Sequence, residues 1–156
     1  NPLDLSHLSW VKVIYDPSGW AYTRDRLKEM PQTIDFNHVT VFPLGFRTDK
    51  AYKLATTDQV ALIQNGKLTH IVEILDSEPY EEGNWYNRLC RVLWWQPEVT
   101  DWSALPAQSE LLGFDPALQD GDPHLIESLK RFGKRWSDNG KMAGFRAYLA
   151  ERLQEK

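Results

Sequence analysis

The dipeptide Asn65-Gly66 constrains the fold of this chain more than any other feature of its sequence. It lies between two apolar runs, residues 59–64 and 67–75. A two-residue type I′ turn requires positive φ at both central positions, and Asn-Gly adopts that conformation readily. The sequence therefore predicts an antiparallel β-hairpin over residues 59–75.

Three further segments are typical of β-strands because they are rich in β-branched and aromatic residues and are bounded by turn residues. They are residues 10–15, 38–42 and 86–95. We expect Pro43 to end the second of these strands, since proline cannot donate a hydrogen bond to a sheet. Trp94 and Trp95 are adjacent in the third, so their side chains should point to opposite faces.

Helices are predicted near the start of the chain and in its last third. The first covers residues 23–30, with Thr23 as the N-cap and Pro31 as the stop. The later ones are a single turn at 100–105, a short helix at 109–112, a helix at 123–132 with Asp122 as N-cap, and a helix at 142–154. Residues 48–54 fit either a helical turn or a loop, and residues 76–84 fit an acidic loop.

This order of elements predicts an α+β fold. Strands joined by hairpins favour a small, mostly antiparallel β-barrel or curved sheet, with the C-terminal helices packed on it. At 156 residues and 42% hydrophobic composition, the chain fits a single domain, β-rich over 1–99 and helical over 100–156. No apolar run approaches the roughly 20 residues of a membrane span, so no membrane partner is expected.

Charge is distributed unevenly along the chain. Residues 72–123 carry 2 basic and 11 acidic side chains, a net charge of −9, whereas residues 124–156 carry 8 basic and 4 acidic ones, a net charge of +4. The total of −4 argues against broad, sequence-independent DNA binding, which depends on many lysine and arginine contacts to phosphate. A local basic surface in the C-terminal segment remains compatible with this balance.

The familiar signatures of enzymes and metal sites are missing from the sequence. Its single cysteine, Cys90, excludes an internal disulfide and lies in an apolar stretch, as expected for a buried, inert thiol in a reducing cytoplasm. The four histidines are far apart in the chain; of these, His70 fits a half-buried strand residue. The segment 120–122 fits a turn and helix cap better than a calcium loop. We therefore expect no metal and no cofactor, and a binding protein rather than an enzyme.

Aromatic residues are unusually frequent: the chain has seven Trp, six Tyr and six Phe. Tryptophan serves both in protein cores and in sites that stack flat ligands, so composition alone leaves both uses open. Core packing is the simpler interpretation of most of them. Arg47 and Arg88 flank aromatic positions and fit either surface ion pairs or contacts to a phosphate.

The middle of the chain contains a series of short motifs in a recognisable order. They are Gly45-Phe46-Arg47-Thr48, Ala51-Tyr52-Lys53-Leu54, Thr57-Asp58-Gln59-Val60-Ala61-Leu62, Leu68-Thr69-His70-Ile71-Val72-Glu73-Ile74 and Arg91-Val92-Leu93-Trp94. Over residues 36–96 this series resembles the PUA-like superfamily, in particular its EVE, YTH and ASCH branches. Thr57 departs from the glycine that usually precedes the aspartate, and the chain from residue 100 onward has no counterpart.

The resemblance implies a small β-barrel whose cleft binds DNA or RNA. In EVE- and YTH-like members an aromatic pocket encloses one modified base. The base loses stacking interactions when it leaves its duplex, and stacking on the aromatic side chains replaces them. By this analogy the candidate ligand-binding residues are Trp20, Tyr22, Arg47, Trp85, Trp94 and Asn87, with Asn84 and Ser18 as further polar groups. A reader module of this kind, meaning a domain that recognises one base, could be part of a larger restriction or RNA-processing protein.

Two other functions remain open. A protein–protein interaction module would use the acidic region 72–123 and the C-terminal helices to dock a partner, a fused domain or a second copy, and it predicts a sizeable exposed apolar patch. An enzyme of an uncommon type would gather polar groups with shifted pKa values in one pocket. The reader hypothesis instead predicts that the candidate aromatic residues converge on one cleft with a positive rim.

Overall fold

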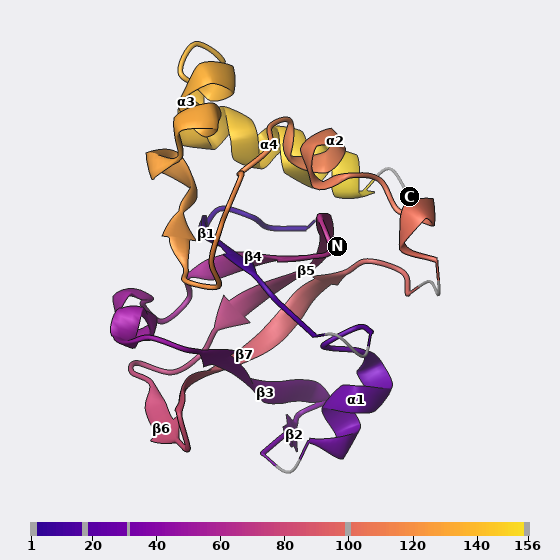
Figure 1. The fold of residues 1–156 in the computed structure, drawn as a ribbon, viewed down its shortest axis with the longest axis vertical. Helices are drawn as coiled ribbons and strands as arrows, with labels where there is room; N and C mark the ends of the chain where they lie inside the picture. The colour runs from indigo at the N-terminus through magenta and orange to yellow at the C-terminus, as the bar shows by residue number, and fades with distance from the viewer. Residues whose placement is uncertain (1–2, 17–18, 31, 99–100, 155–156) are drawn as a thin grey trace.

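Eight β-strands form one open sheet in the computed structural model, which describes residues 3–16, 19–30, 32–98 and 101–154. The order across the sheet is β2-β3-β7-β5-β4-β1-β8, with β6 also beside β7 (Figure 1). The strands are β1 Leu8–Val13, β2 Ile34–Phe36, β3 Val39–Phe46, β4 Gln59–Gln64, β5 Lys67–Ile74, β6 Tyr80–Glu82, β7 Trp85–Trp95 and β8 His124–Leu125. Among the strands of the described residues, only β1 and β4 pair in parallel. The predicted α+β class with a mostly antiparallel sheet is confirmed, and the sheet does not close into a barrel.

The predicted hairpin is present as β4 and β5. Asn65 and Gly66 have φ angles of 53° and 74°, as a type I′ turn requires. Every residue of β4 is buried. Burial on both faces explains why this strand is a continuous apolar run rather than an alternating one.

The prediction that Pro43 ends its strand is wrong. Strand β3 continues through Pro43 to Phe46, and Pro43 pairs with Leu89 of β7. The pairing with β2 stops at Val41, so beyond that point β3 pairs, among the described residues, with β7 only. Proline is tolerated there because an edge position needs no N–H donor on its free side.

Two strands of three residues each lie where no strand was predicted. Segment 76–84, expected to be a loop, contains β6, which pairs with the start of β7. Strand β2 pairs with β3 around the tight turn at Asn37 and His38, both of which have positive φ. Each strand has three residues, too few to show a hydrophobic period.

Among the described residues, all the α-helices except the third lie where they were expected. The α-helices are α1 Arg24–Glu29, α2 Gln108–Leu112, α3 Lys130–Trp136 and α4 Lys141–Gln154, with 3₁₀ turns η1 Asp49–Lys53, η2 Trp102–Ala104 and η3 Ile126–Ser128. The Thr23 hydroxyl accepts a hydrogen bond from the Arg26 N–H, so the predicted N-cap of α1 is confirmed. Pro31, its predicted stop, lies outside the described residues. Helices α2, α3 and α4 gather on one side of the sheet (Figure 1).

The helix predicted over 123–132 is wrong. His124 and Leu125 instead form β8, which pairs with β1, and helix α3 begins only at Lys130. Asp122 does not cap a helix, because its carboxylate accepts hydrogen bonds from Thr48 Oγ1 at 2.8 Å and Lys50 Nζ at 3.0 Å. These tertiary contacts override the local Asp-Pro signal.

Two hydrophobic cores lie on the two faces of the sheet. The helix-side core joins buried residues of β1, β4 and β5 to α2, α3 and α4, and includes Phe132, Trp136 and Phe145. The opposite core contains Trp10 and Ile14 from the β1 segment together with Phe42, Leu44 and Phe46 from β3, although these strands are far apart in the sheet order. The sheet therefore curves around this second core. Trp94 packs on the first core and Trp95 on the second, which confirms that they point to opposite faces.

Arg88 of β7 is fully buried, so the surface ion pair expected for it is wrong. Its Nε donates to Asp76 Oδ1 at 2.8 Å, and its Nη1 donates to the carbonyls of Ala51 and Leu54. Its Nη2 donates to the Asp76 carbonyl, and Asp76 Oδ2 accepts from the N–H of Leu89. One guanidinium thus joins η1, the segment before β6 and strand β7.

Replacing Arg88 should therefore destabilise the protein strongly. In Arg88→Met, the Asp76 carboxylate and three carbonyls lose a donor, which should lower the free energy of unfolding by about 3–5 kcal/mol. Arg91→Met is the matched control, because Arg91 pairs with Glu73 at 2.7 Å but is 39% exposed, and it should cost about 1 kcal/mol or less. Urea unfolding of both variants measures the two losses, and equal losses would contradict the role given to Arg88.

Candidate ligand-binding site

A cavity of about 550 Å³ lies between the β1 segment and β3, where the curved sheet stays open. The β1 segment contributes Lys12 and Ile14, and β3 contributes Pro43 and Gly45. Across from them lie residues of β6, of β7 and of the segment that includes α1. These are Tyr15, Asp16, Ala21, Tyr22, Arg26, Met30, Gln32, Tyr80, Glu82, Gly83, Trp85 and Asn87. We call this the seam cavity.

Among the aromatic residues that line the cavity and belong to a strand, Trp85 is the most exposed. It is 41% exposed and begins β7. Its six-membered ring lies against Gly45, where a Cβ atom would come within 3.0 Å of Cε3. The Arg47 guanidinium lies 4.2 Å from a ring centroid of Trp85, in cation–π geometry. Gly45 therefore allows the ring to lie flat on the strand, and Arg47 covers part of it.

Tyr22 closes the inner side of the cavity, and its carbonyl is held by a hydrogen bond. Burial raises the pKa of its hydroxyl, although the backbone of Gly45 partly opposes that shift. His70 Nε2 lies 2.7 Å from the Tyr22 carbonyl, which can only accept, so Nε2 carries the proton and Nδ1 accepts from Thr69 Oγ1 at 2.8 Å. Burial lowers the pKa of His70 to about 4, which keeps the ring neutral at pH 7.

The carboxylates that line the cavity are already paired. Asp16 Oδ2 accepts from Arg26 Nη1 at 2.8 Å, and Glu82 accepts from Gln32 Nε2 at 3.1 Å. Asn87 pairs with Gly45 across the β3–β7 ladder, which places it on the same face as Trp85. The amide of Asn87 offers both donors and an acceptor beside the aromatic ring.

Lys12 is the unusual polar residue of the seam cavity. It is only 5% exposed, its Nζ lies 5.1 Å from the centroid of the Phe46 ring, and it forms no ion pair with a described residue. Burial lowers its pKa to about 8, although the negative charges of Asp122 and Asp120 partly oppose that shift. An amine with such surroundings is typical of a binding or reaction site rather than of a core.

The structure brings together part of the predicted site. Tyr22, Trp85 and Asn87 line the seam cavity, and Arg47 stacks on Trp85. Trp20 and Trp94 do not line it. Ser18 lies outside the described residues. Asn84 is exposed in the β6–β7 turn and does not line the cavity, although its neighbours Gly83 and Trp85 do.

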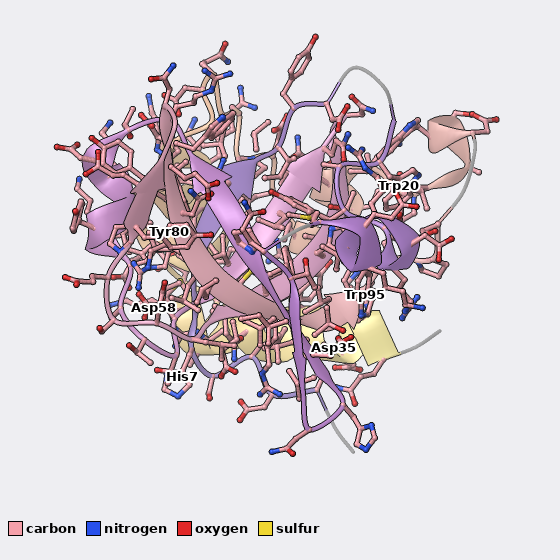
Figure 2. The ribbon with its side chains drawn as sticks, turned by 90° about the horizontal axis from the view of Figure 1, so that it is seen from below. His7, Trp20, Asp35, Asp58, Tyr80 and Trp95 are labelled. Atoms are coloured by element: carbon pink, nitrogen blue, oxygen red, sulfur yellow. The ribbon has the colours of Figure 1, made fainter. Side chains whose placement is uncertain are left out.

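Trp20 and Trp94 are engaged elsewhere. Trp20 stacks on Trp102 with ring centroids 4.6 Å apart, and Trp94 packs against the helix-side core. Figure 2 shows Trp20 on the opposite side of the molecule from Tyr80, which lines the seam cavity. The two tryptophans therefore do not belong to the same site as Trp85.

Sequence reasoning missed Lys12, Tyr80 and Arg26 as lining residues. A signal for Lys12 was present: it alternates with Trp10 and Ile14, which both point into the second core. No local signal marks Tyr80 or Arg26, because long-range pairing and packing bring them to the cavity.

Other kinds of site find little support in the described part of the chain. No group of three or more His, Cys, Asp or Glu residues there is arranged to hold a metal ion. Cys90 is fully buried and burial raises its thiol pKa, so it is not a nucleophile at neutral pH. Within the same residues, no helix is both long and apolar enough to cross a membrane.

In comparisons with protein-family models, curated proteins and solved structures, the chain has no match. The resemblance to the PUA-like superfamily therefore stays a prediction.

Lys12→Met should stabilise the protein at neutral pH. The folded-state pKa of Lys12 is about 8 and its ordinary value is 10.5, so below pH 8 the charged amine is buried at full cost, roughly 3 kcal/mol. Between pH 8 and 10.5 the unfolded chain binds a proton that the folded chain has released, so rising pH stabilises the wild type. The difference in free energy of unfolding between Lys12→Met and the wild type should therefore become smaller.

Urea unfolding at pH 7 and pH 10 measures this difference. Lys28→Met is the control, because Lys28 is exposed on α1 and its replacement removes the same charge. The explanation is wrong if Lys12→Met is less stable than the wild type at pH 7, or if its advantage is the same at both pH values.

Proposed function

We propose that this protein is a nucleic-acid reader that holds one base, flipped out or single-stranded, in the seam cavity. The observation that supports this most directly is the placement of an accessible Trp85 ring, Tyr22 and Asn87 in one cavity. A base has two flat faces and a polar edge, and this lining offers rings for the faces and an amide for the edge.

Stacking supplies the affinity in this proposal. A base that stacks on an aromatic side chain contributes about 1–3 kcal/mol. Arg47 is exposed, so its guanidinium can leave the Trp85 ring and contact the phosphate next to the bound base. The two cavity carboxylates, Asp16 and Glu82, are each held by a donor, which limits their repulsion of a phosphate.

The alternative of a protein-interaction module has weaker support. The apolar sides of α2, α3 and α4 are packed into the helix-side core and are not free for a partner. The large apolar side chains that are exposed among the described residues lie elsewhere: Tyr15, Ile34, Tyr52, Trp85 and Leu125. Two of these, Tyr15 and Trp85, line the seam cavity. Docking by the acidic region 72–123 stays a prediction.

Substitution of Trp85 tests the proposal. Fluorescence anisotropy of short labelled oligonucleotides, plain and base-modified, gives the affinity at low and moderate salt. Trp85→Leu removes the stacking surface and should weaken binding by about 5- to 150-fold. Trp85→Phe keeps an aromatic face and should retain most of the affinity.

Trp102→Leu is the matched control, because it removes a tryptophan that stacks on Trp20 outside the seam cavity. It should bind like the wild type. Absence of binding to every oligonucleotide at low salt, where attraction to phosphate is strongest, would refute the proposal.

A further inference from the structure

The side chain of Lys12 enters the seam cavity from the inner face of the sheet. It alternates with Trp10 and Ile14 along the β1 segment, and both of these neighbours belong to the second core. Its Nζ lies beside the ring of Phe46, while the preceding residue of β3, Gly45, supports the ring of Trp85. Lys12 and Trp85 therefore approach the same cavity from two sides of one strand.

Most of the hydrogen-bonding capacity of Lys12 is unused. An ammonium group has three N–H donors. Among the described residues its one acceptor is the carbonyl of Val13, at a long distance of 3.4 Å. Asp120 and Asp122 act on it only through their charge, since Asp122 is held by Thr48 and Lys50 and Asp120 by His124. At least two donors of a nearly buried ammonium are thus left to an occupant of the cavity.

Building on the reader function, we propose that Lys12 selects the base by donating hydrogen bonds to adjacent acceptors on its edge, so that the seam cavity prefers guanine-type purines. Guanine presents O6 and N7 as two neighbouring acceptors, the pair that lysine and arginine side chains contact most often. Adenine carries an amino group in place of O6, and that donor would face the donors of Lys12. Cytosine presents an amino donor at the corresponding edge, and thymine a single acceptor.

The size of the cavity does not by itself provide this selectivity. About 550 Å³ accommodates any of the four bases, modified or plain, so shape is a weak filter. A buried group that can only donate hydrogen bonds discriminates more strongly than shape does. An occupant that places a donor against it leaves both donors without an acceptor, which costs binding free energy. Lys12 is the side chain in the lining that combines full charge, near-complete burial and unused donors.

The test uses oligonucleotides that offer a single base. A short labelled strand carries G, A, C or T at its centre, with abasic spacers on both sides, and anisotropy gives the affinity of each for the full chain. We expect the G strand to bind at least about fivefold more tightly than the A strand. In Lys12→Met this ratio should fall to near one, while Lys28→Met, which loses the same charge on an exposed helix, should keep it.

The outcomes separate this inference from the reader function. Equal binding of G and A by the wild type, or an unchanged ratio in Lys12→Met, overturns the role of Lys12 and leaves the reader function standing if Trp85→Leu still weakens binding. Binding of none of the strands refutes both proposals. Since Lys12→Met should be more stable than the wild type, its melting temperature shows that a lost preference is not a loss of folding.

Discussion

The seam cavity depends on the buried ion pair between Arg88 and Asp76. Arg88 is next to Asn87 in β7, and its guanidinium holds η1 and the segment that leads into β6. Strand β6 brings Tyr80 to the cavity, and β7 brings Trp85. A buried arginine that uses four of its five N–H donors is directional, whereas apolar contacts would permit several positions of these segments. The interaction therefore fixes the relative position of two walls of the site.

The open sheet explains why there is a cavity at this place. A closed barrel would join β1 to β3 by backbone hydrogen bonds and leave no lateral gap. In this chain Pro43 and Gly45 occupy the edge of β3, where Pro43 has no N–H to offer to a neighbouring strand. The Tyr22 side chain packs against the second core and lines the cavity beside this edge. The curvature still lets both edges share one core, so the gap is narrow and lined rather than exposed to solvent along its whole length.

The parts of the fold that were predictable are those determined by a few adjacent residues. Asn65-Gly66 requires a tight turn, Thr23 caps its own helix, and adjacent Trp94 and Trp95 must diverge in a strand. The errors at Pro43 and Asp122 have one cause: each residue has a strong local preference that a partner distant in sequence overrides. The site follows the same rule. Trp85, Asn87 and Tyr22 were named through a resemblance, but only the fold separates them from Trp20 and Trp94, which were named by the same analogy.

Lys12 lowers the stability of the fold but suits the proposed binding of a base. Its neighbours Trp10 and Ile14, on the same face of the β1 segment, are apolar and pack in the second core. A lysine there loses hydration without gaining an ion pair to any described residue, so the folded state becomes less stable than an apolar side chain would make it. Polar residues that are unfavourable for stability tend to lie where a ligand makes up the missing interaction. In this chain the missing interaction lies within a cavity whose other walls carry aromatic rings, and both features are met by an occupant with a flat face and an acceptor-bearing edge.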